Sequence, residues 1–566
     1  MLPAGSVGQK LNNPSIRLCH SLPRLWCKTR TWMLTFSSPF SLIPLTTMNI
    51  ATDPWLPVVS VAGRSEAVSL RDAFARAHEI RDLSLRPDER ISVMRLLLCI
   101  SHAALDGPAN RKEWRGCRER IAPAVGDYLD RTAQAFNLFG DSRRFLQVDL
   151  KPIKTRGDKS GSLSKLNFAL ATGSNATLFD HAGGDQRNFD AAKQALNLIT
   201  FQCFSPGGTI GVGLWGGKPT LGWASYPKPA HGYSAHAPCV AGSMLHTFLI
   251  GSNLLQTVHL NLLNKELISE ALGKNRWGRP IWEWMPASPS DQSAVENATL
   301  TYLGRLVPLS RAIRLGKGGH SLALANGLDF AAFEEGFREP TATIIVISKG
   351  DKRTTLRASL DRAPWRQLHA LTVRRFAQNS SGGPLALDNL NGGEEFDLWV
   401  GALVADRGKI IDVLESVFPK VPPALLGDAG QRVYQDGVKY SEDAANRLWK
   451  AVFVYHKQID NSLDRPDAKS RREILQLTAA SRFWTETEQA RHLLLALVKD
   501  SAELGLKSNY GATRWGKAVL QAAHRAYQLT CPHETSRQMQ AFVAGLKQLN
   551  TNQWLIQIKL THLSTV

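Results

Sequence analysis

Cysteine is scarce in this sequence, and the cysteines present are not arranged for disulfide or metal chemistry. Seven occur among 566 residues, and no two of them form a C-x-x-C pair. An odd number without such pairs argues against a disulfide framework and against a zinc knuckle. Free thiols are typical of reducing compartments, so we expect a cytoplasmic protein.

Long hydrophobic runs are also missing, as are acidic residues at the beginning of the chain. No stretch reaches the roughly 18–20 apolar residues that a membrane-spanning helix requires, so we expect no membrane partner. Residues 1–47 contain five basic residues and no aspartate or glutamate, a composition found in transit peptides. Met48, however, opens a sequence with the character of a natural start. We therefore interpret residues 1–47 as an extension outside the folded protein, either disordered or translated from upstream sequence.

The signatures of common enzyme families are absent as well. The sequence contains no H-E-x-x-H, G-x-S-x-G or EF-hand pattern. His231 and His236 lie in a stretch rich in glycine and proline, without neighbours that would complete a metal site. We therefore predict no catalytic residues, no metal ion and no cofactor. Aspartates and glutamates are scattered along the chain, and a nuclease assembled from dispersed carboxylates stays open as an alternative.

One glycine motif imitates a nucleotide-binding pattern. Gly211, Gly213 and Gly216 match the spacing G-x-G-x-x-G, which in dinucleotide-binding proteins opens a helix and precedes an acidic residue about 20 positions later. Here Pro219 follows instead, and residues 226–245 contain neither aspartate nor glutamate. The glycines therefore indicate close backbone approach to a partner, which the missing Cβ permits, rather than a cofactor site.

What the sequence does contain is an excess of positive charge. Lysine and arginine number 68 against 49 aspartates and glutamates, which gives a net charge of +19 and a pI of about 9.7. Neutralising phosphates releases condensed counterions, so such an excess favours nucleic acid as a partner. Residues 151–165, basic and rich in glycine and serine, are one candidate contact. An even surface charge that only maintains solubility is the alternative interpretation.

Hydrophobic patterning predicts an α+β protein with two folded domains. Residues 48–400 mix strand and helix signals, which predicts a mixed α/β globular domain. Beyond about residue 400 helical spacing dominates and predicts an all-α, C-terminal four-helix bundle over residues 401–566. The main expected elements are a strand at 55–59, a helix that begins after Ser69, a buried helix at 89–105, a strand at 341–348, and helices at 409–418, 441–458, 486–502, 513–528 and 536–549.

Three segments resemble one known family. They are MNIATDPWLPV at residues 48–58, ALATGSNATLFDH at residues 169–181 and FQCFSPGG at residues 201–208. All three are similar to the CasA family, the large subunit of the type I-E CRISPR surveillance complex called Cascade. The resemblance covers nearly all of residues 48–566 and leaves residues 1–47 outside.

The resemblance implies a task without catalysis. Such a subunit recognises the short protospacer-adjacent motif (PAM) in double-stranded target DNA and opens the duplex to start an R-loop with the guide RNA, and a nuclease-helicase is then recruited. The implied partners are therefore double-stranded target DNA, CRISPR guide RNA, the other Cascade subunits and the nuclease-helicase effector, in a cytoplasmic ribonucleoprotein complex of antiviral defence. A purely structural scaffold subunit is a second alternative.

The resemblance also places candidate binding residues. Phe179 occupies the position of a family aromatic in a loop that contacts the 5′ end of the guide RNA and the PAM region, and Asn175 belongs to the same loop. Gly208, with Gly207 beside it, matches a glycine-loop position that approaches the PAM from the minor groove. Backbone groups of glycine meet base edges there because no Cβ intervenes.

Two further candidates come from a looser alignment. Lys317 is the candidate for a family lysine that reaches into the same groove. Arg407, followed by Gly408, stands where a family hairpin carries a glutamine that wedges open the first base pair. An arginine can still act as a wedge because its planar guanidinium stacks on bases. The departure from glutamine leaves the identity of the PAM open.

Overall fold

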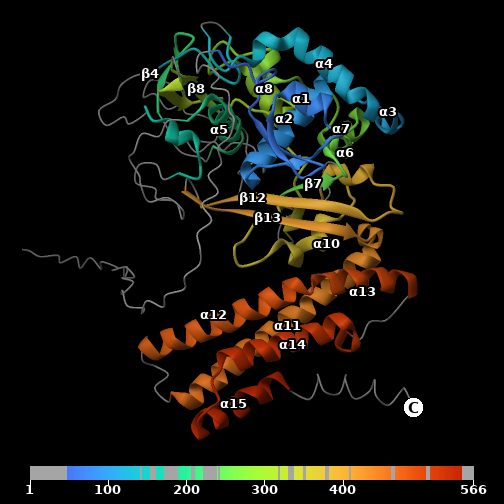
Figure 1. The fold of residues 1–566 in the computed structure, drawn as a ribbon, viewed down its shortest axis with the longest axis vertical. Coiled ribbons are helices and arrows are strands. Elements are labelled where there is room, and N and C mark those ends of the chain that lie inside the picture. Colours follow the sequence, from blue (N-terminus) through green and yellow to red (C-terminus); the bar gives the residue numbers. More distant parts are fainter. Residues whose placement is uncertain are drawn as a thin grey trace, which may run out of the picture. The chain divides into compact units, whose positions relative to one another are not determined.

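The computed structural model describes most of the chain between Thr47 and Asn550 (Figure 1). All described residues belong to one unit, residues 43–566. Apart from Thr47, the predicted extension at residues 1–47 lies outside them. The described ranges are 47–140, 143–152, 161–170, 189–205, 211–220, 239, 243–316, 319–328, 337–347, 352–376, 381–406, 409–460, 466–504 and 510–550.

A small antiparallel sheet follows Trp55, as the sequence predicts. β1 (Leu56–Ser60) pairs with β2 (Ser65–Val68) and β3 (Ile80–Leu83). α1 (Leu70–Ala75) begins after Ser69, whose hydroxyl accepts a hydrogen bond from the Asp72 amide at 3.0 Å. This bond satisfies a free amide of the first helical turn, which explains why the helix begins after the serine.

α2 (Pro87–Leu105) is the central helix of the mixed region. Its residues 88–102 are all buried, as expected for a helix that is apolar on most of its circumference. α2 packs against α4 (Ile121–Thr132) and α5 (Ala191–Phe204), and the predicted buried helix is confirmed. The other helices here are α3 (Arg111–Gly116), α6 (Leu254–Asn261), α7 (Lys265–Leu272), α8 (Gln292–Leu300), α9 (Tyr302–Leu306) and α10 (Leu368–Leu371).

Further short strands pair antiparallel in the same region. Gly216 and Gly217 have positive φ angles of 56° and 78° and form the turn between two of them, so a strand, not a helix, follows the glycine motif. The predicted strand at residues 341–348 is confirmed in its central part. The pairs are β4 (Leu150–Pro152) with β5 (Gly213–Trp215), β5 with β6 (Lys218–Pro219), β8 (Arg311–Leu315) with β9 (Leu322–Asn326), and β10 (Ile344–Ile347) with β11 (Lys352–Thr355).

A long hairpin contradicts one expectation from the sequence. β12 (Phe396–Asp406) pairs with β13 (Lys409–Val421) on one side and with β7 (His246–Ile250) on the other. The expected helix at residues 409–418 is therefore wrong. Burial alternates along β13, with Ser416 and Phe418 buried and Val417 exposed, which is the period of a strand. The expected domain boundary at residue 400 falls within β12.

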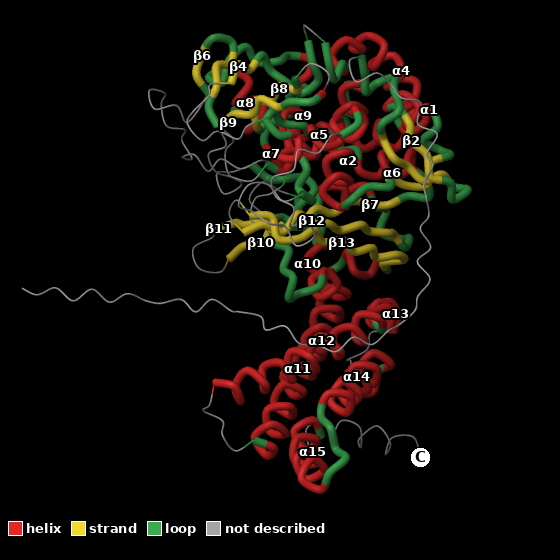
Figure 2. The backbone as a smooth tube through the Cα atoms, turned by 60° about the vertical axis from the view of Figure 1, so that its left-hand side comes forward, coloured by secondary structure: helices red, strands yellow, loops and turns green. Residues whose placement is uncertain are grey.

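Five helices follow Gly427 in the described part of the chain. They are α11 (Asp428–Ile459), α12 (Pro466–Gln489), α13 (Arg491–Leu504), α14 (Arg514–Thr530) and α15 (Ser536–Leu549). Figure 1 shows α12 and α13 running end to end, with only Ala490 between them. Because these two helices together occupy one position, the five helices form a four-helix bundle (Figure 2). The predicted α+β fold and C-terminal bundle are confirmed, and the helix expected at 486–502 is interrupted by that break.

Trp365 joins the mixed region to the bundle. It is 1% exposed, and its ring lies 5.9 Å from that of Trp515 and 6.2 Å from that of Trp484, centroid to centroid. The Tyr434 hydroxyl, on α11, donates a hydrogen bond to the Trp365 carbonyl at 2.7 Å. The hydrophobic core therefore continues from the mixed region into the helices.

Candidate nucleic-acid interface

All seven candidate binding residues lie outside the described residues. They are Asn175, Phe179, Gly207, Gly208, Lys317, Arg407 and Gly408. The structure does describe the residues next to each of these segments, and those residues determine where each segment leaves the folded scaffold. The positions of these flanking residues therefore define the candidate interface.

The residues on either side of the glycine segment, residues 206–210, are both hydrogen-bonded to the β8–β9 pair, one through a side chain and the other through the main-chain amide of Asn326. Before it, the Ser205 hydroxyl accepts a hydrogen bond from Nε of Arg311 at 2.7 Å. After it, the Gly211 carbonyl accepts one from the Asn326 amide at 3.2 Å. Arg311 and Asn326 are cross-strand partners in β8 and β9, and Nη1 of the arginine donates to Oδ1 of the asparagine at 2.9 Å. We call these four residues the glycine-segment anchor.

The anchor contains a buried positive charge. Arg311 is 4% exposed, and it donates hydrogen bonds to the neutral oxygens of Ser205 and Asn326. Burial lowers the pKa of Arg311 to about 10, because the charged form loses hydration. A pKa of about 10 still leaves the guanidinium protonated at neutral pH, so a cation contacts Ser205, the residue that precedes the glycine segment.

Gln202 fastens the same end of α5 to β8. Its Nε2 donates to the carbonyls of Leu146 and Arg311 at 3.1 and 3.0 Å, and its Oε1 accepts from the Arg311 amide at 2.9 Å. Gln202 is fully buried, so these bonds are needed to offset the loss of water. The glycine segment thus leaves from a rigid helix end.

The opposite end of α5 holds two other candidate segments. Gln194, in its first turn, donates from Nε2 to the Phe189 carbonyl at 2.8 Å and to the Gly319 carbonyl at 3.0 Å. Phe189 follows the segment that contains Asn175 and Phe179, and Gly319 lies two residues after Lys317. Gly319 has φ +67°, and a Cβ there would lie 2.6 Å from Nε2 of Gln194. Only glycine permits this approach.

The tip of the β12–β13 hairpin is tied to the end of α5 that carries the glycine segment. The Ser243 hydroxyl makes two hydrogen bonds with the main chain of Ala405, two residues before Arg407. Four residues earlier, the Cys239 amide donates to the Cys203 carbonyl on α5 at 3.1 Å. Four chain steps span at most about 14 Å, so the hairpin tip and this end of α5 lie close together.

The candidate segments therefore fall into two groups. Ser205, before the glycine segment, and Ala405, two residues before Arg407, lie near the C-terminal end of α5, whereas Gly319, two residues after Lys317, and Phe189, ten residues after Phe179, meet at its N-terminal end. Gln194 and Ser205 are eleven residues apart on α5, or about 16 Å at 1.5 Å per residue. This separation corresponds to roughly five base pairs of duplex at 3.4 Å each.

A buried polar network supports the scaffold. Arg95, on α2, forms an ion pair with Glu339, whose carboxylate also accepts from the Thr341 hydroxyl at 3.2 Å. Thr341 lies 2.8 Å from Nδ1 of His246, and Nε2 of that histidine lies 3.0 Å from the Cys239 carbonyl. This series of hydrogen bonds connects α2 to Cys239, which contacts α5, and it positions Cys239 from inside the protein.

The ionisable groups in this network have defined protonation states at neutral pH. Burial by itself raises the pKa of Glu339, but the neighbouring Arg95 guanidinium outweighs burial and the net pKa is lowered. The carboxylate is therefore ionised at neutral pH. Burial lowers the pKa of His246 to about 4, so that imidazole is neutral. These groups form a structural network, since each is enclosed and hydrogen-bonded.

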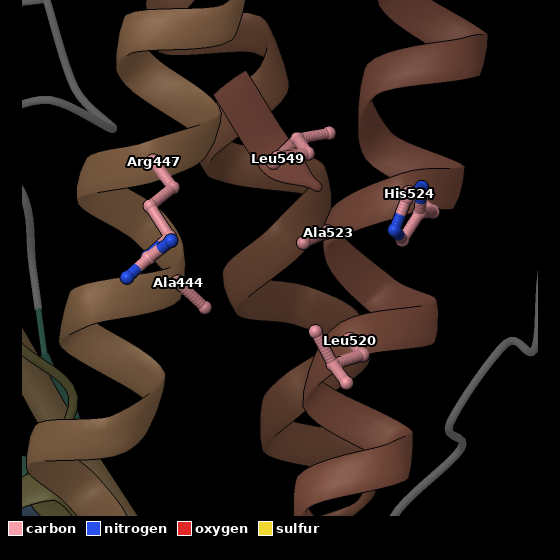
Figure 3. A pocket seen from close by; sticks show the side chains of 6 residues that line it. All are labelled: Ala444, Arg447, Leu520, Ala523, His524 and Leu549. Atoms are coloured by element: carbon pink, nitrogen blue, oxygen red, sulfur yellow. The ribbon is translucent and has the colours of Figure 1, made fainter. Parts of the chain in front are cut away.

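A hollow in the bundle is too small for a substrate. It lies between α11, α14 and α15 (Figure 3) and encloses about 190 Å³, part of it open solvent. Small-molecule sites usually measure about 300–1,000 Å³. Its side chains are mostly apolar: Ala444, Arg447, Leu520, Ala523, His524 and Leu549.

Over the described ranges, no three histidine, cysteine, aspartate or glutamate side chains gather as metal ligands do. No helix within those ranges is long and apolar enough to cross a membrane.

Sequence patterns missed the residues that hold the candidate segments. Arg311 and Asn326 lie more than 100 residues after the glycine segment, and nothing local connects them to it. Gln194 and Gln202 carried a weak signal, because they stand eight residues apart on a largely apolar helix. Residues at that spacing share a face, which indicates two buried amides with partners.

Comparisons with known proteins point to one family. The model of the family described as CRISPR-associated protein Cse1 matches residues 49–526. The CRISPR-associated protein CasA/Cse1 of Thermus thermophilus is 28% identical over 515 residues, which cover 85% of this chain and 92% of that protein. The family match thus extends over most of the chain.

Solved structures share the fold. The structure of Thermus thermophilus CasA (Cse1) superposes with a TM-score of 0.66 at 23% identity, over 89% of this chain and 98% of that one. A chain of a CRISPR RNA-guided surveillance complex superposes with a TM-score of 0.63 at 18% identity, over 89% of this chain and 100% of that one. Both the mixed region and the bundle are therefore included in the shared fold.

Proposed function

Because this chain belongs to the CRISPR-associated protein Cse1 family, we propose that it is the non-catalytic large subunit of an RNA-guided surveillance complex. In this proposal the subunit recognises the PAM of double-stranded target DNA in the minor groove and opens the neighbouring base pair. The guide RNA then pairs with one strand, and a separate nuclease-helicase is recruited to the R-loop.

One structural relationship carries this proposal. Ser205, which precedes the segment with Gly207 and Gly208, and Ala405, which precedes Arg407 by two residues and is held by Ser243, both lie near the C-terminal end of α5. A segment that contacts the minor groove and a side chain that separates a base pair have to act on adjacent base steps. The residues that hold the two therefore have to be neighbours. The two supports belong to strands and helices, which hold functional groups more accurately than free loops.

The energetic requirement is modest. Unstacking one base step costs a few kcal/mol, which an inserted side chain and minor-groove hydrogen bonds have to offset. Arg407 supplies a planar guanidinium for stacking, and Gly208 supplies backbone groups for the groove. Lys317, two residues before the Gly319 that contacts Gln194 in the first turn of α5, adds a cation for the same duplex.

Electrostatics favours the same partner. The chain carries a net charge of +19, and the charged Arg311 contacts Ser205, the residue that precedes the glycine segment. Counterion release then supplies sequence-independent affinity, while the groove contacts supply selectivity. The minor groove offers a degenerate pattern of donors and acceptors, so we expect several related PAM sequences to be tolerated.

We assign separate tasks to the two regions. The mixed region from residue 48 to about 400 carries Asn175, Phe179, Gly207, Gly208 and Lys317, and we propose that it binds the DNA and the guide RNA. The bundle that follows is proposed to dock the other subunits. The β12–β13 hairpin, which carries Arg407 and Gly408, lies at the proposed boundary near residue 400 and connects the two tasks.

A gel-shift experiment tests the proposal. The complex is reconstituted with guide RNA and titrated, at two stated salt concentrations, against duplexes that differ only in the PAM. We expect tight binding to a small set of PAM sequences and at least about 100-fold weaker binding to the others, as expected when two base pairs are altered at about 1–3 kcal/mol each. Equal affinity for all duplexes contradicts the proposal.

The two alternatives have separate tests. A nuclease with dispersed carboxylates predicts that the purified chain cleaves labelled duplex in the presence of Mg²⁺ or Mn²⁺, and our proposal predicts that it does not. A purely structural scaffold predicts that Lys317→Ala and Arg407→Ala leave the DNA affinity of the assembled complex unchanged, whereas we expect both substitutions to weaken it.

A further inference from the structure

The segment between α7 and α8 holds an arginine side chain stacked on a tryptophan. Cζ of Arg279 lies 4.2 Å from the centroid of the Trp284 ring. Trp284 is partly buried and packs against the hydrophobic core, whereas Arg279 is exposed. A partner can therefore reach a planar cation that rests on an aromatic ring.

This pair differs from the other pairs of a tryptophan with a cation. Within the described ranges three other tryptophans lie under a cation, and each of those cations also forms an ion pair with a carboxylate. Arg279 has no such carboxylate among the described residues. The three other sets are Arg90 over Trp399 with Asp82, Lys265 over Trp277 with Asp106, and Arg366 over Trp484 with Glu442. The charge of Arg279 is therefore left for an anionic partner.

The main chain that carries Arg279 is held firmly. The side chain of Asn297, on α8, donates from Nδ2 to the Arg279 carbonyl at 3.0 Å and accepts at Oδ1 from the Arg279 amide at 3.2 Å. Gly278 has φ +73°, and a Cβ there would collide with Oγ1 of Thr301, so the chain lies closer to the end of α8 than another residue allows. The stacked pair thus has a rigid support.

Further cations lie beside the stacked pair in the sequence. Residues 274–284 contain Lys274, Arg276 and Arg279 against the single carboxylate of Glu283, which accepts a hydrogen bond from the Tyr128 hydroxyl at 2.6 Å. Lys274 is exposed and Arg276 partly exposed, and neither forms an ion pair within the part of the chain that the structure describes. Cations next to a planar stacking surface suit a strand in which phosphates alternate with bases.

We infer that Arg279 and Trp284 form a stacking site for a base of single-stranded nucleic acid, and that Lys274 and Arg276 contact its phosphates. In a duplex the faces of the bases are covered by their neighbours, so the stacking surface requires a single strand. An acidic peptide matches the charges but has no base to stack on the planar pair. Every base has a π face, so the site takes DNA or RNA. It does not depend on the PAM contacts proposed above.

The first test is strand binding by the purified full chain. Fluorescein-labelled strands of about 12 nucleotides, one of deoxythymidine and one of uridine, suit the size of a single-strand site and are titrated by fluorescence anisotropy. Trp284→Leu keeps an apolar side chain against the core but removes the ring, and we expect it to raise the Kd for both strands at least about 5-fold. Arg279→Lys keeps the charge but not the plane, and it should raise the Kd about 3-fold or more.

Two variants serve as controls for these substitutions. Trp284→Phe keeps an aromatic ring and should bind both strands within about 3-fold of the wild type. Arg131→Lys makes the same replacement at an exposed arginine of α4, and it should leave the Kd unchanged. Thermal unfolding verifies that each variant is folded. Since Arg279 is exposed, Arg279→Lys carries the test even if Trp284→Leu does not fold.

Photocrosslinking in the reconstituted complex locates the contact and identifies the strand. Iodouracil is placed either in the guide RNA or in the target strand that the guide displaces, and the crosslinked peptide is identified by mass spectrometry. We expect a crosslink to Trp284 from at least one of the two. A crosslink from the guide assigns RNA to the site, and one from the displaced strand assigns DNA.

The outcomes that overturn the inference are separate from those that concern the PAM. Unchanged Kd values for folded Trp284→Leu and Arg279→Lys overturn it, as do a wild-type chain that binds neither strand and the absence of any crosslink to Trp284. If the variants bind strands normally but copurify less with the other subunits, the surface is a protein contact and the nucleic-acid site is overturned. Failure of the wild-type complex to discriminate between PAM sequences bears only on the proposed function.

Discussion

The side-chain hydroxyl of Ser243 makes two hydrogen bonds with the main chain of Ala405, donating to its carbonyl oxygen and accepting from its amide, each at 3.0 Å. Ser243 is 7% exposed, so water does not readily replace either bond. A single hydroxyl thus holds the β12–β13 hairpin two residues before Arg407. In the proposed function this bond pair keeps the wedge in place.

Removing this hydroxyl should loosen the hairpin tip. Ser243→Ala leaves the main-chain amide and carbonyl of Ala405 without the serine hydroxyl as a hydrogen-bond partner. This loss should lower the free energy of unfolding by about 1–3 kcal/mol. We also expect the assembled complex to open a duplex more slowly, measured by the fluorescence of 2-aminopurine placed next to the PAM. Ser252→Ala, at an exposed serine, is the matched control and should change neither quantity.

Trp365 should be essential for the junction between the mixed region and the bundle. It is enclosed by Trp484 and Trp515 and is 1% exposed, so Trp365→Ala leaves a large cavity and should cost about 3–5 kcal/mol. Trp449→Ala provides the control, because Trp449 lies on α11 with 41% exposure. Chemical denaturation of both variants measures the difference, and equal losses would show that Trp365 does not join the two regions.

Two buried histidines predict a loss of stability in mild acid. Burial lowers the pKa of both His102 and His246 to about 4, from an ordinary value of 6.5. The unfolded chain therefore binds more protons than the folded chain between these two values, and the free energy of unfolding falls as the pH drops through that window. From pH 7 to pH 5 each histidine should account for about 2 kcal/mol.

Denaturation curves at several pH values measure this effect. His246→Gln should remove about half of the decline that the two histidines cause, even if its stability at pH 7 is lower. His78, which is exposed, is the control, and His78→Gln should leave the pH dependence as it is. A decline of the same size in the His246→Gln variant and in the wild-type protein would contradict this assignment.

The sequence located the bundle well because amphipathic helices carry their own periodicity. α14 and α15 were found within two residues at each end. β13 was misread because Ile410, Val413, Leu414 and Val417 are spaced as on one face of a helix. The deciding interaction is the pairing with β12, whose residues are not included when the spacing of apolar residues is tested over 409–418 alone. Helical spacing and strand alternation coincide in short apolar runs, and the tertiary partner then determines the structure.

The sequence proposes the segments of the candidate site, which stay predictions, but it gives no sign of the residues that hold them. The family-like segments pointed to Phe179 and Gly208, and glycine itself indicated a close approach of the backbone. Arg311 gave no comparable signal, because an arginine in a strand is ordinarily at the surface. Its burial follows from contacts with Ser205, 106 positions earlier, and such long-range contacts leave no pattern in a single sequence.

Arg407 offers the sharpest test of the wedge, because the family resemblance supplies the substitution. Arg407→Gln installs the glutamine of the related hairpin and keeps a planar group that can insert between bases, so opening of the duplex should persist. Arg407→Ala removes the planar group and should slow opening at least about 10-fold, equivalent to about 1.4 kcal/mol in the barrier. Binding to a duplex already unpaired at the first position should not change for Arg407→Gln beyond the loss of one charge. The 2-aminopurine assay distinguishes the variants, and the same opening rate for Arg407→Ala and the wild type would show that this arginine only contacts the DNA surface.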